Sequence, residues 1–171
     1  MRAARRGRTL VSTVPPGATE HVDIGLSAFV NAAVLITGRT PGEREFCARM
    51  IHARGRNARG PFVTFRPPNG HWLWPDLPLV GDPSESRLSR CFAEARGGTF
   101  FLANVDTLPR SGQRCLEGLL DRTASLPPEA ANLRVISASA SLWRSCQSQQ
   151  FSLSLFYRLN TIHIDLDRTT F

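Results

Sequence analysis

Short apolar segments alternate with amphipathic segments along most of this chain. The apolar segments are rich in β-branched and aromatic residues, and several are bounded by glycine or proline, which is typical of buried strands. These predicted strands lie at residues 32–37, 61–65, 99–105, 133–138 and 162–164. Helical periodicity in the segments between them predicts an α/β fold with a mostly parallel sheet, whose ligands bind beyond the carboxyl ends of the strands.

The first predicted helix runs for about three turns after the first strand, and three more are predicted at residues 86–95, 111–123 and 151–158. In the first helix the apolar residues at helical spacing are Phe46, Cys47, Met50 and Ile51. We expect Arg44 and the other charged residues to lie on other faces of this helix.

Two segments lack the alternation. Residues 1–20 are rich in arginine and contain a Pro-Pro-Gly sequence, which predicts a poorly ordered leader before one folded unit over residues 21–171. The leader either contacts nucleic acid or is a solvated tail, and we favour the tail because no aromatic residues lie between its arginines. Residues 67–78 are too rich in proline for regular structure and predict a loop. Within that loop, Trp72 and Trp74 either bind a partner or cover apolar sheet surface, and we favour the second interpretation.

The composition narrows the class of protein. The chain has 171 residues, 42% of them apolar, which is enough for one domain with a sizeable buried core. No run approaches the roughly 18 apolar residues of a membrane span, and the start lacks the apolar core of a secretory signal, so we expect a cytoplasmic protein without membrane contact. The four cysteines have no metal-ligand spacing and are interpreted as reduced buried thiols. All 21 basic residues are arginine, and the formal net charge is +7.

Five segments follow one another in an order that is characteristic of a known family, at residues 34–38, 60–63, 92–102, 133–138 and 155–160. Together they resemble the nucleotide-binding core of the bacterial sigma-54 activator ATPases, and the resemblance covers residues 22–164. It implies a three-layer RecA-like P-loop NTPase (AAA+) core. The chain stops where the family's helical lid begins, so we expect the lid and the DNA-binding module to be absent.

The loop after the first strand aligns with the family's phosphate-binding loop. The family sequence G-E-S-G-T-G-K-E is replaced by G-R-T-P-G-E-R-E at residues 38–45. In the family, successive backbone N–H groups of this loop wrap the phosphates, and its lysine contacts the terminal ones. The resemblance assigns the corresponding cofactor-binding positions to Gly38, Thr40, Gly42, Arg44 and Glu45.

Three differences weaken this loop as a phosphate site. Pro41 has no N–H to donate, Glu43 places a carboxylate beside phosphate oxygens, and the planar guanidinium of Arg44 does not simply replace a lysine ammonium. We therefore favour an ordinary turn capped by the following helix. The alternative is that Arg39, Arg44 and the helix N-terminus still attract an anion weakly.

The acidic pair that holds magnesium and orients water in the family corresponds to Ala103 and Asn104. An alanine side chain cannot ligate the metal, and the amide of Asn104 cannot act as a base. The resemblance therefore implies no catalytic residue and no metal site here. Asp106 lies two residues further on. In a strand or its exit turn, a two-residue shift displaces a carboxylate by roughly 6–7 Å, so we expect Asp106 to be too far away to substitute.

The remaining family features are also incomplete. Nothing between the second and third predicted strands matches the family's G-A-F-T-G-A loop. Of the two arginine-finger positions, which correspond to Ser152 and Arg158, only Arg158 is retained. Arg158 either pairs across a subunit interface or forms a salt bridge at a helix end. The sensor position reads Ser139 or Ala140.

The leading hypothesis is a non-hydrolysing pseudo-ATPase without a cofactor. It would act in transcription regulation by contacting sigma-54 activator AAA+ subunits or other transcription proteins. The alternative is an ATP-dependent sigma-54 activator domain that retains weak ATP binding. A third reading is a decayed gene product with no selected role.

Overall fold

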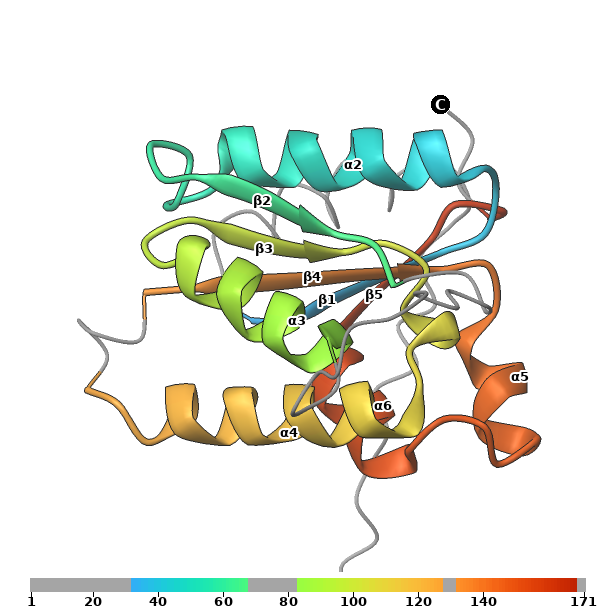
Figure 1. Cartoon of the computed structure of the whole chain (residues 1–171). Helices are drawn as coiled ribbons and strands as arrows, with labels where there is room; N and C mark the ends of the chain where they lie inside the picture. Colours follow the sequence, from blue (N-terminus) through green and yellow to red (C-terminus); the bar gives the residue numbers. More distant parts are fainter. Residues whose placement is uncertain (1–31, 68–82, 128–131, 169–171) are drawn as a thin grey trace, which may run out of the picture.

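A computed structural model describes residues 32–67, 83–127 and 132–168. In this part of the chain, five parallel strands form one sheet in the order β2-β3-β4-β1-β5 (Figure 1). The strands are β1 (Val34–Thr37), β2 (Phe62–Phe65), β3 (Thr99–Leu102), β4 (Arg134–Ser139) and β5 (Ile162–Asp165). The predicted α/β fold with a parallel sheet is confirmed.

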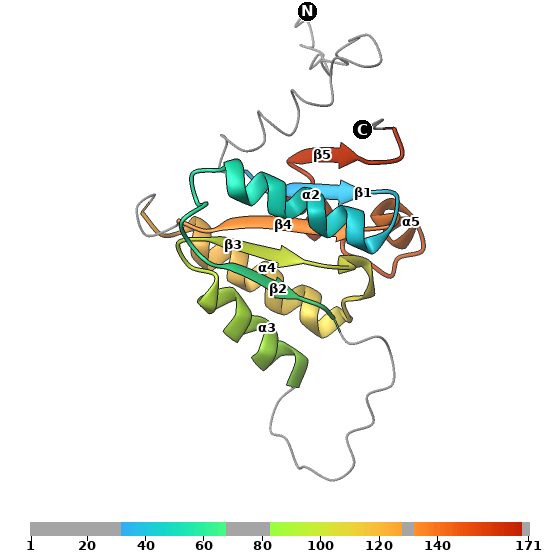
Figure 2. The ribbon, with the colours of Figure 1, turned by 90° about the horizontal axis from the view of Figure 1, so that it is seen from above.

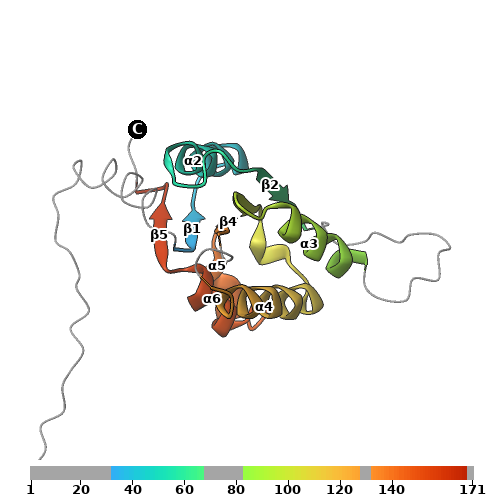
Figure 3. The same cartoon turned by 90° about the vertical axis from the view of Figure 1, so that its left-hand side faces the viewer.

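The helices cover both faces of the sheet and give three layers. One face carries α2 (Pro41–Arg54), and the opposite face carries the others (Figures 1 and 3). Those are α3 (Pro83–Glu94), α4 (Arg110–Ala124), α5 (Leu142–Gln147) and α6 (Leu153–Leu159). No helix of the described residues is long and apolar enough to cross a membrane.

Both faces of the sheet are buried, which explains the continuous apolar runs in the sequence. Successive side chains of a strand point to opposite faces. In β1, Val34 and Ile36 pack into the cluster beneath α2, whereas Leu35 packs into the cluster on the other face. In β3, Phe101 faces α2 and Phe100 faces the opposite helices.

The prediction for the buried face of α2 is wrong at two positions. The buried residues of this helix are Arg44, Cys47, Ala48 and Ile51, which have the spacing of one helical face. Arg44 is only 3% exposed, whereas Phe46 is 60% exposed. The backbone geometry therefore places a charged side chain inside and an aromatic side chain outside.

The third predicted strand is too long. β3 ends at Leu102, and Asn104 takes a left-handed conformation with φ 52° and ψ 51°. Asparagine adopts this region more readily than most residues. The chain then enters a short 3-10 helix, η1 (Val105–Thr107), which, like α5, has no counterpart among the predicted elements.

Two adjacent strands send the chain to opposite faces of the sheet. β1 continues into α2 on one face (Figure 2), and β4 continues into α5 and α6 on the other (Figure 3). In open α/β sheets, ligands bind in the crevice that such a divergence opens beyond the strand ends. The predicted phosphate-binding loop lies at this point, between β1 and α2.

Several predictions concern other parts of the molecule. The leader and the loop with Trp72 and Trp74 lie outside the described residues. The cysteines are free thiols: Cys47 and Cys146 are buried, while Cys91 and Cys115 are half-buried.

Candidate functional site

The loop between β1 and α2 is closed by a capping box. Thr40 precedes the helix, and its hydroxyl oxygen accepts a hydrogen bond from the Glu43 backbone N–H at 3.3 Å. In return, the Glu43 carboxylate accepts the Thr40 backbone N–H at 3.0 Å and the Thr40 hydroxyl at 2.7 Å. These hydrogen bonds from Thr40 are the main reason that the pKa of Glu43 is lowered. Pro41 begins the helix, and a proline is tolerated there because the first N–H groups of a helix have no intrahelical acceptor.

The guanidinium of Arg44 lies under this loop and binds its carbonyl oxygens. One terminal nitrogen donates to the carbonyl of Gly38 at 2.7 Å and to that of Arg39 at 2.6 Å. The other approaches Oδ1 of Asn104 at 3.4 Å. Burial lowers the pKa of Arg44, an effect opposed mainly by the negative charge of Asp106. The loop thus turns acceptors, rather than N–H donors, toward the position that replaces the family's lysine.

A carboxylate that follows the neighbouring edge strand, β5, occupies a backbone donor of the loop. Oδ1 of Asp167, just after β5, accepts the Arg39 N–H at 2.8 Å. Gly38 and Arg39 both have positive φ, 82° and 44°. A Cβ added to Gly38 would lie 2.7 Å from Cγ of Asp167, so the two residues approach as closely as a glycine allows.

The two positions that correspond to the family's acidic pair carry no acid in this structure. Ala103 is 8% exposed and packs in the cluster beneath α2. Asn104 contacts Arg44 through its side-chain oxygen. The left-handed turn at Asn104 ends the extended chain, and Asp106 lies within electrostatic range of Arg44. Within the described part of the chain, Oδ1 of Asp106 and Nε of Arg44 are buried without a hydrogen-bond partner.

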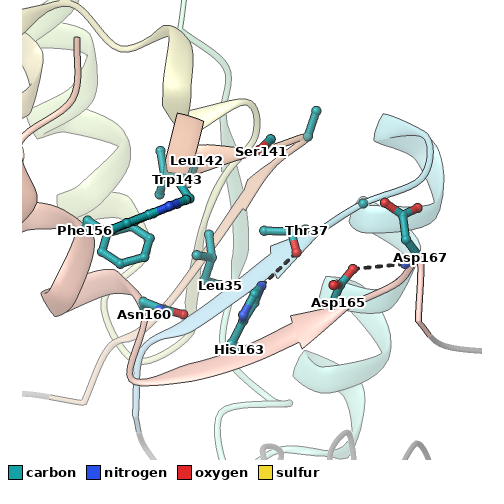
Figure 4. A pocket seen from close by; sticks show the side chains of 12 residues that line it. Leu35, Thr37, Ser141, Leu142, Trp143, Phe156, Asn160, His163, Asp165 and Asp167 are labelled. Atoms are coloured by element: carbon teal, nitrogen blue, oxygen red, sulfur yellow. Dashed lines mark hydrogen bonds between the residues drawn. The ribbon is translucent and has the colours of Figure 1, made fainter. Parts of the chain in front are cut away.

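A pocket of about 370 Å³ lies beside the loop, on the face of the sheet that carries α5 and α6 (Figure 4). β1 and β5 form its floor, and Trp143 and Phe156 form its wall. Gly38 of the loop and Asp167, which binds the loop, also line this pocket. Among the described residues, no three histidine, cysteine or acidic side chains are grouped so that they could hold a metal ion.

Comparison with known proteins decides the family. A family model described as "Sigma-54 interaction domain" matches residues 23–168. This chain belongs to the sigma-54 interaction domain family. It is 31% identical over 146 residues to the nitrogen assimilation regulatory protein NtrX of Azorhizobium caulinodans, covering 78% of this chain and 32% of the relative. It is also 31% identical over 159 residues to the DNA-binding transcriptional regulator NtrC of Salmonella typhimurium, covering 84% of this chain and 33% of that protein.

Solved structures agree with this assignment. The P-loop NTPase domain of the sigma-54 transport activator from E. coli is 25% identical, with a TM-score of 0.62, and the match covers 85% of this chain and 98% of that one. NtrX from Brucella abortus, crystallised with ATP, is 24% identical with a TM-score of 0.67, and the match covers 94% and 39% of the two chains. The chain spans about a third of the length of the curated relatives it matches. The predicted RecA-like P-loop NTPase fold is therefore confirmed.

In this sigma-54 interaction domain, two predicted site residues lie away from the loop. The carboxylate of Glu45 forms ion pairs with Arg49, at 2.8 Å, and with Arg66. Arg158, at the arginine-finger position, pairs with Asp121 of α4. That pair corresponds to the local salt bridge that the sequence left open as an alternative.

Two other family positions have structural roles in this domain. The hydroxyl oxygen of Ser152 caps α6 by accepting the Leu155 N–H at 3.3 Å, and it donates to Glu117 at 2.8 Å. At the sensor position, Ser139 is buried and its hydroxyl oxygen accepts the Ser141 N–H at 3.2 Å.

The structure brings Gly38, Thr40, Arg44 and Asn104 together and adds one residue that sequence reasoning did not select. Asp167 lies beyond the segments that carry the family resemblance, and no motif marks it. The available signal was topological, because parallel strands bring their carboxyl ends to one edge of a sheet. β5 pairs with β1, which places the residues after both strands side by side.

Proposed function

We propose that this domain is a non-hydrolysing member of its family that acts in transcription regulation through protein contacts. Its partners would be AAA+ subunits of sigma-54 activators or another transcription protein. The observation that carries the proposal is that the N–H groups of Arg39, Thr40 and Glu43 and the guanidinium of Arg44 already bind oxygen atoms of the chain itself.

Nucleotide binding would have to break these internal contacts. A phosphate-binding loop needs free N–H groups and a cation that faces the ligand. Here the Arg39 N–H binds Asp167, and the Thr40 and Glu43 N–H groups are used in the capping box. Arg44 binds the loop's own carbonyls. A phosphate would also meet the carboxylates of Glu43 and Asp167, which repel it.

Hydrolysis has a separate obstacle. Neither Ala103 nor Asn104 offers a carboxylate for magnesium or for the attacking water. Asp106 lies near the guanidinium of Arg44, which counters the attraction of its carboxylate for a metal cation. ATP bound at this loop would therefore meet no group that activates water.

The surface of α5 and α6 supports the protein-contact part of the proposal. Leu153 and Tyr157 are four residues apart on α6 and are 50% and 67% exposed. Trp143 of α5 is 49% exposed, and Phe156 packs against both Trp143 and Tyr157. Exposed apolar side chains that lie close together are typical of interaction surfaces.

Two measurements test the proposal. Calorimetric titration with ATP and magnesium is expected to show no binding. Micromolar affinity for ATP would contradict the proposal that the loop does not bind nucleotide. Co-purification with the AAA+ domain of a sigma-54 activator is expected without nucleotide and should be weakened by Tyr157→Ser. Phe46→Ser is the matched control, because Phe46 is equally exposed but lies on α2, across the sheet.

The alternative, an ATP-dependent activator domain, predicts different results. Phosphate release would require magnesium and would be lost in Arg44→Ala. Complex formation would then depend on nucleotide. Absence of both phosphate release and complex formation would favour a chain without a selected role.

A further inference from the structure

The pocket beside the loop has a chemistry that differs from that of a phosphate site. It lies at the crevice where the chain leaves β1 and β4 toward opposite faces of the sheet, the usual position of ligand sites in this type of fold. Leu35 and Thr37 of β1 pair in register with His163 and Asp165 of β5. Because alternate residues of a strand share a face, these four side chains form one continuous floor (Figure 4).

One side of the pocket is an aromatic corner. The rings of Trp143 and Phe156 have centroids 5.5 Å apart and planes inclined at 51°. Leu35 is 1% exposed and adds an apolar surface beneath them, whereas the tryptophan is 49% exposed. This side suits a flat apolar group, and the face of a tryptophan ring attracts cations.

The opposite side of the pocket is acidic. Asp165 and Asp167 line it, and no arginine is among the described residues that do so, although arginines account for the net charge of +7. Arg168 pairs with Asp165 at 3.4 Å but is 88% exposed, so solvent screens its charge strongly. Asp167 accepts the uncharged N–H of Arg39, and its own N–H donates to Asp165 at 3.1 Å. The guanidinium of Arg44 lies within electrostatic range of Asp167 but does not line the pocket.

The histidine between the two sides does not oppose a cation. Nε2 of His163 lies 2.7 Å from the hydroxyl oxygen of Thr37. Partial desolvation against the sheet lowers the pKa of His163, so the imidazole is neutral at neutral pH. The charged side chains that line the pocket are thus the two carboxylates, within the described part of the chain.

We propose that this pocket binds an organic ammonium ion that carries a flat apolar group. The ammonium lies at Asp165 and Asp167, and the apolar group packs on Trp143 and Phe156. The volume of about 370 Å³ accommodates a compound with one or two rings. This site is independent of the proposed loss of nucleotide binding, because its ligand carries the opposite charge to ATP.

Isothermal titration calorimetry with four probes tests the proposal. 2-Phenylethylamine and benzyltrimethylammonium are expected to bind, whereas phenylacetate, of similar shape and opposite charge, is expected not to. Adenosine, a flat uncharged probe, is also expected not to bind. The proposal would be overturned if phenylacetate or adenosine bound as tightly as the amines. It would also be overturned if neither amine gave a measurable heat of binding at millimolar concentration.

Variants locate the site. Asp165→Asn and Asp167→Asn are each expected to weaken amine binding about tenfold, the equivalent of 1.4 kcal/mol. Trp143→Leu should weaken benzyltrimethylammonium similarly, because its phenyl group loses the ring against which it packs. Asp121→Asn is the matched control, because Asp121 lies on α4 outside the pocket. If Asp121→Asn loses as much amine affinity as the pocket variants, the amine binds elsewhere. The same conclusion follows if neither Asp165→Asn nor Asp167→Asn loses amine affinity.

Circular dichroism checks the folding of each variant. If one variant fails to fold, the comparison of amine with phenylacetate binding on the unchanged chain still decides the proposal.

Discussion

The carboxylate of Asp167 accepts the backbone N–H of Arg39 at 2.8 Å, across 128 positions of the sequence. This hydrogen bond joins the end of β5, an edge strand, to the loop that follows β1, the strand beside it. An anion supplied by the chain itself therefore occupies a donor of the loop at which relatives would hold phosphate. The consequences can be measured by removing each member of this arrangement.

Replacing Arg44 with methionine is expected to destabilise the domain by about 1–3 kcal/mol, because the buried carbonyl of Gly38 and that of Arg39 lose their donor. The midpoint of urea unfolding measures the change. Arg49→Met is the control, because Arg49 forms a partly exposed ion pair with Glu45 and should lose at most about 1 kcal/mol. Equal losses in the two variants would show that the contacts of Arg44 contribute no more than a surface pair.

Asp167→Ala is expected to lower stability by about 0.5–1.5 kcal/mol, because the hydrogen bond that it removes is exposed to solvent. The freed Arg39 N–H should then accept an inorganic anion. Thermal unfolding with increasing sulfate should restore more stability to this variant than to Glu94→Ala, a change at an exposed position of α3 that corrects for the general effect of sulfate on folded proteins. A sulfate response no larger than that of the control would mean that the loop does not bind anions even when opened.

The thiol of Cys47 predicts a pH dependence. Burial raises its pKa to about 11, so the folded state holds the thiol proton more tightly than the unfolded chain does. The resulting stability is fully present below the ordinary thiol pKa of 9.0 and is lost as the pH rises toward 11, by about 2–3 kcal/mol in total. Urea unfolding between pH 8 and 10.5 should therefore show a steeper decline for the unchanged chain than for Cys47→Ala. Parallel declines would contradict this assignment.

Two phenylalanines test the burial pattern. Phe101→Ala should cost about 3–5 kcal/mol, because the ring is 1% exposed between the sheet and α2. Phe46→Ala should change stability by no more than about 0.5 kcal/mol, because its ring is mostly in solvent. Chemical unfolding of the two variants gives both values, and a large loss for Phe46 would mean that another surface covers it.

Much of this fold follows from the sequence because its strands are buried on both faces. Such strands appear as uninterrupted apolar runs, as at Phe100 and Phe101, which face opposite sides of the sheet. The six residues of α5 were missed because they are too few to display helical periodicity. The exchange of Arg44 and Phe46 between inside and outside was missed because polarity alone does not reveal that a loop offers carbonyls to a guanidinium.

The candidate site was predictable only where it is local in sequence. The loop at residues 38–45 and the lost acids at Ala103 and Asn104 could be found by comparing short segments with a family pattern. The role of Asp167 could not, because it depends on which strands become neighbours. Likewise, the position of Asp106 depends on one left-handed residue, Asn104, whose conformation the sequence permits without requiring it.

The pairing of β1 constrains how the chain can acquire its structure during synthesis. Val34 is bonded on both sides within the sheet, yet its partners are Ile136 and Ile162, more than a hundred positions later. The ribosome must therefore release β4, and with it most of the fold, before β1 finds either neighbour. Contacts between such distant positions slow folding, because a large loop must close before they form. Until then, the apolar residues of β1 remain available to chaperones or to aggregation.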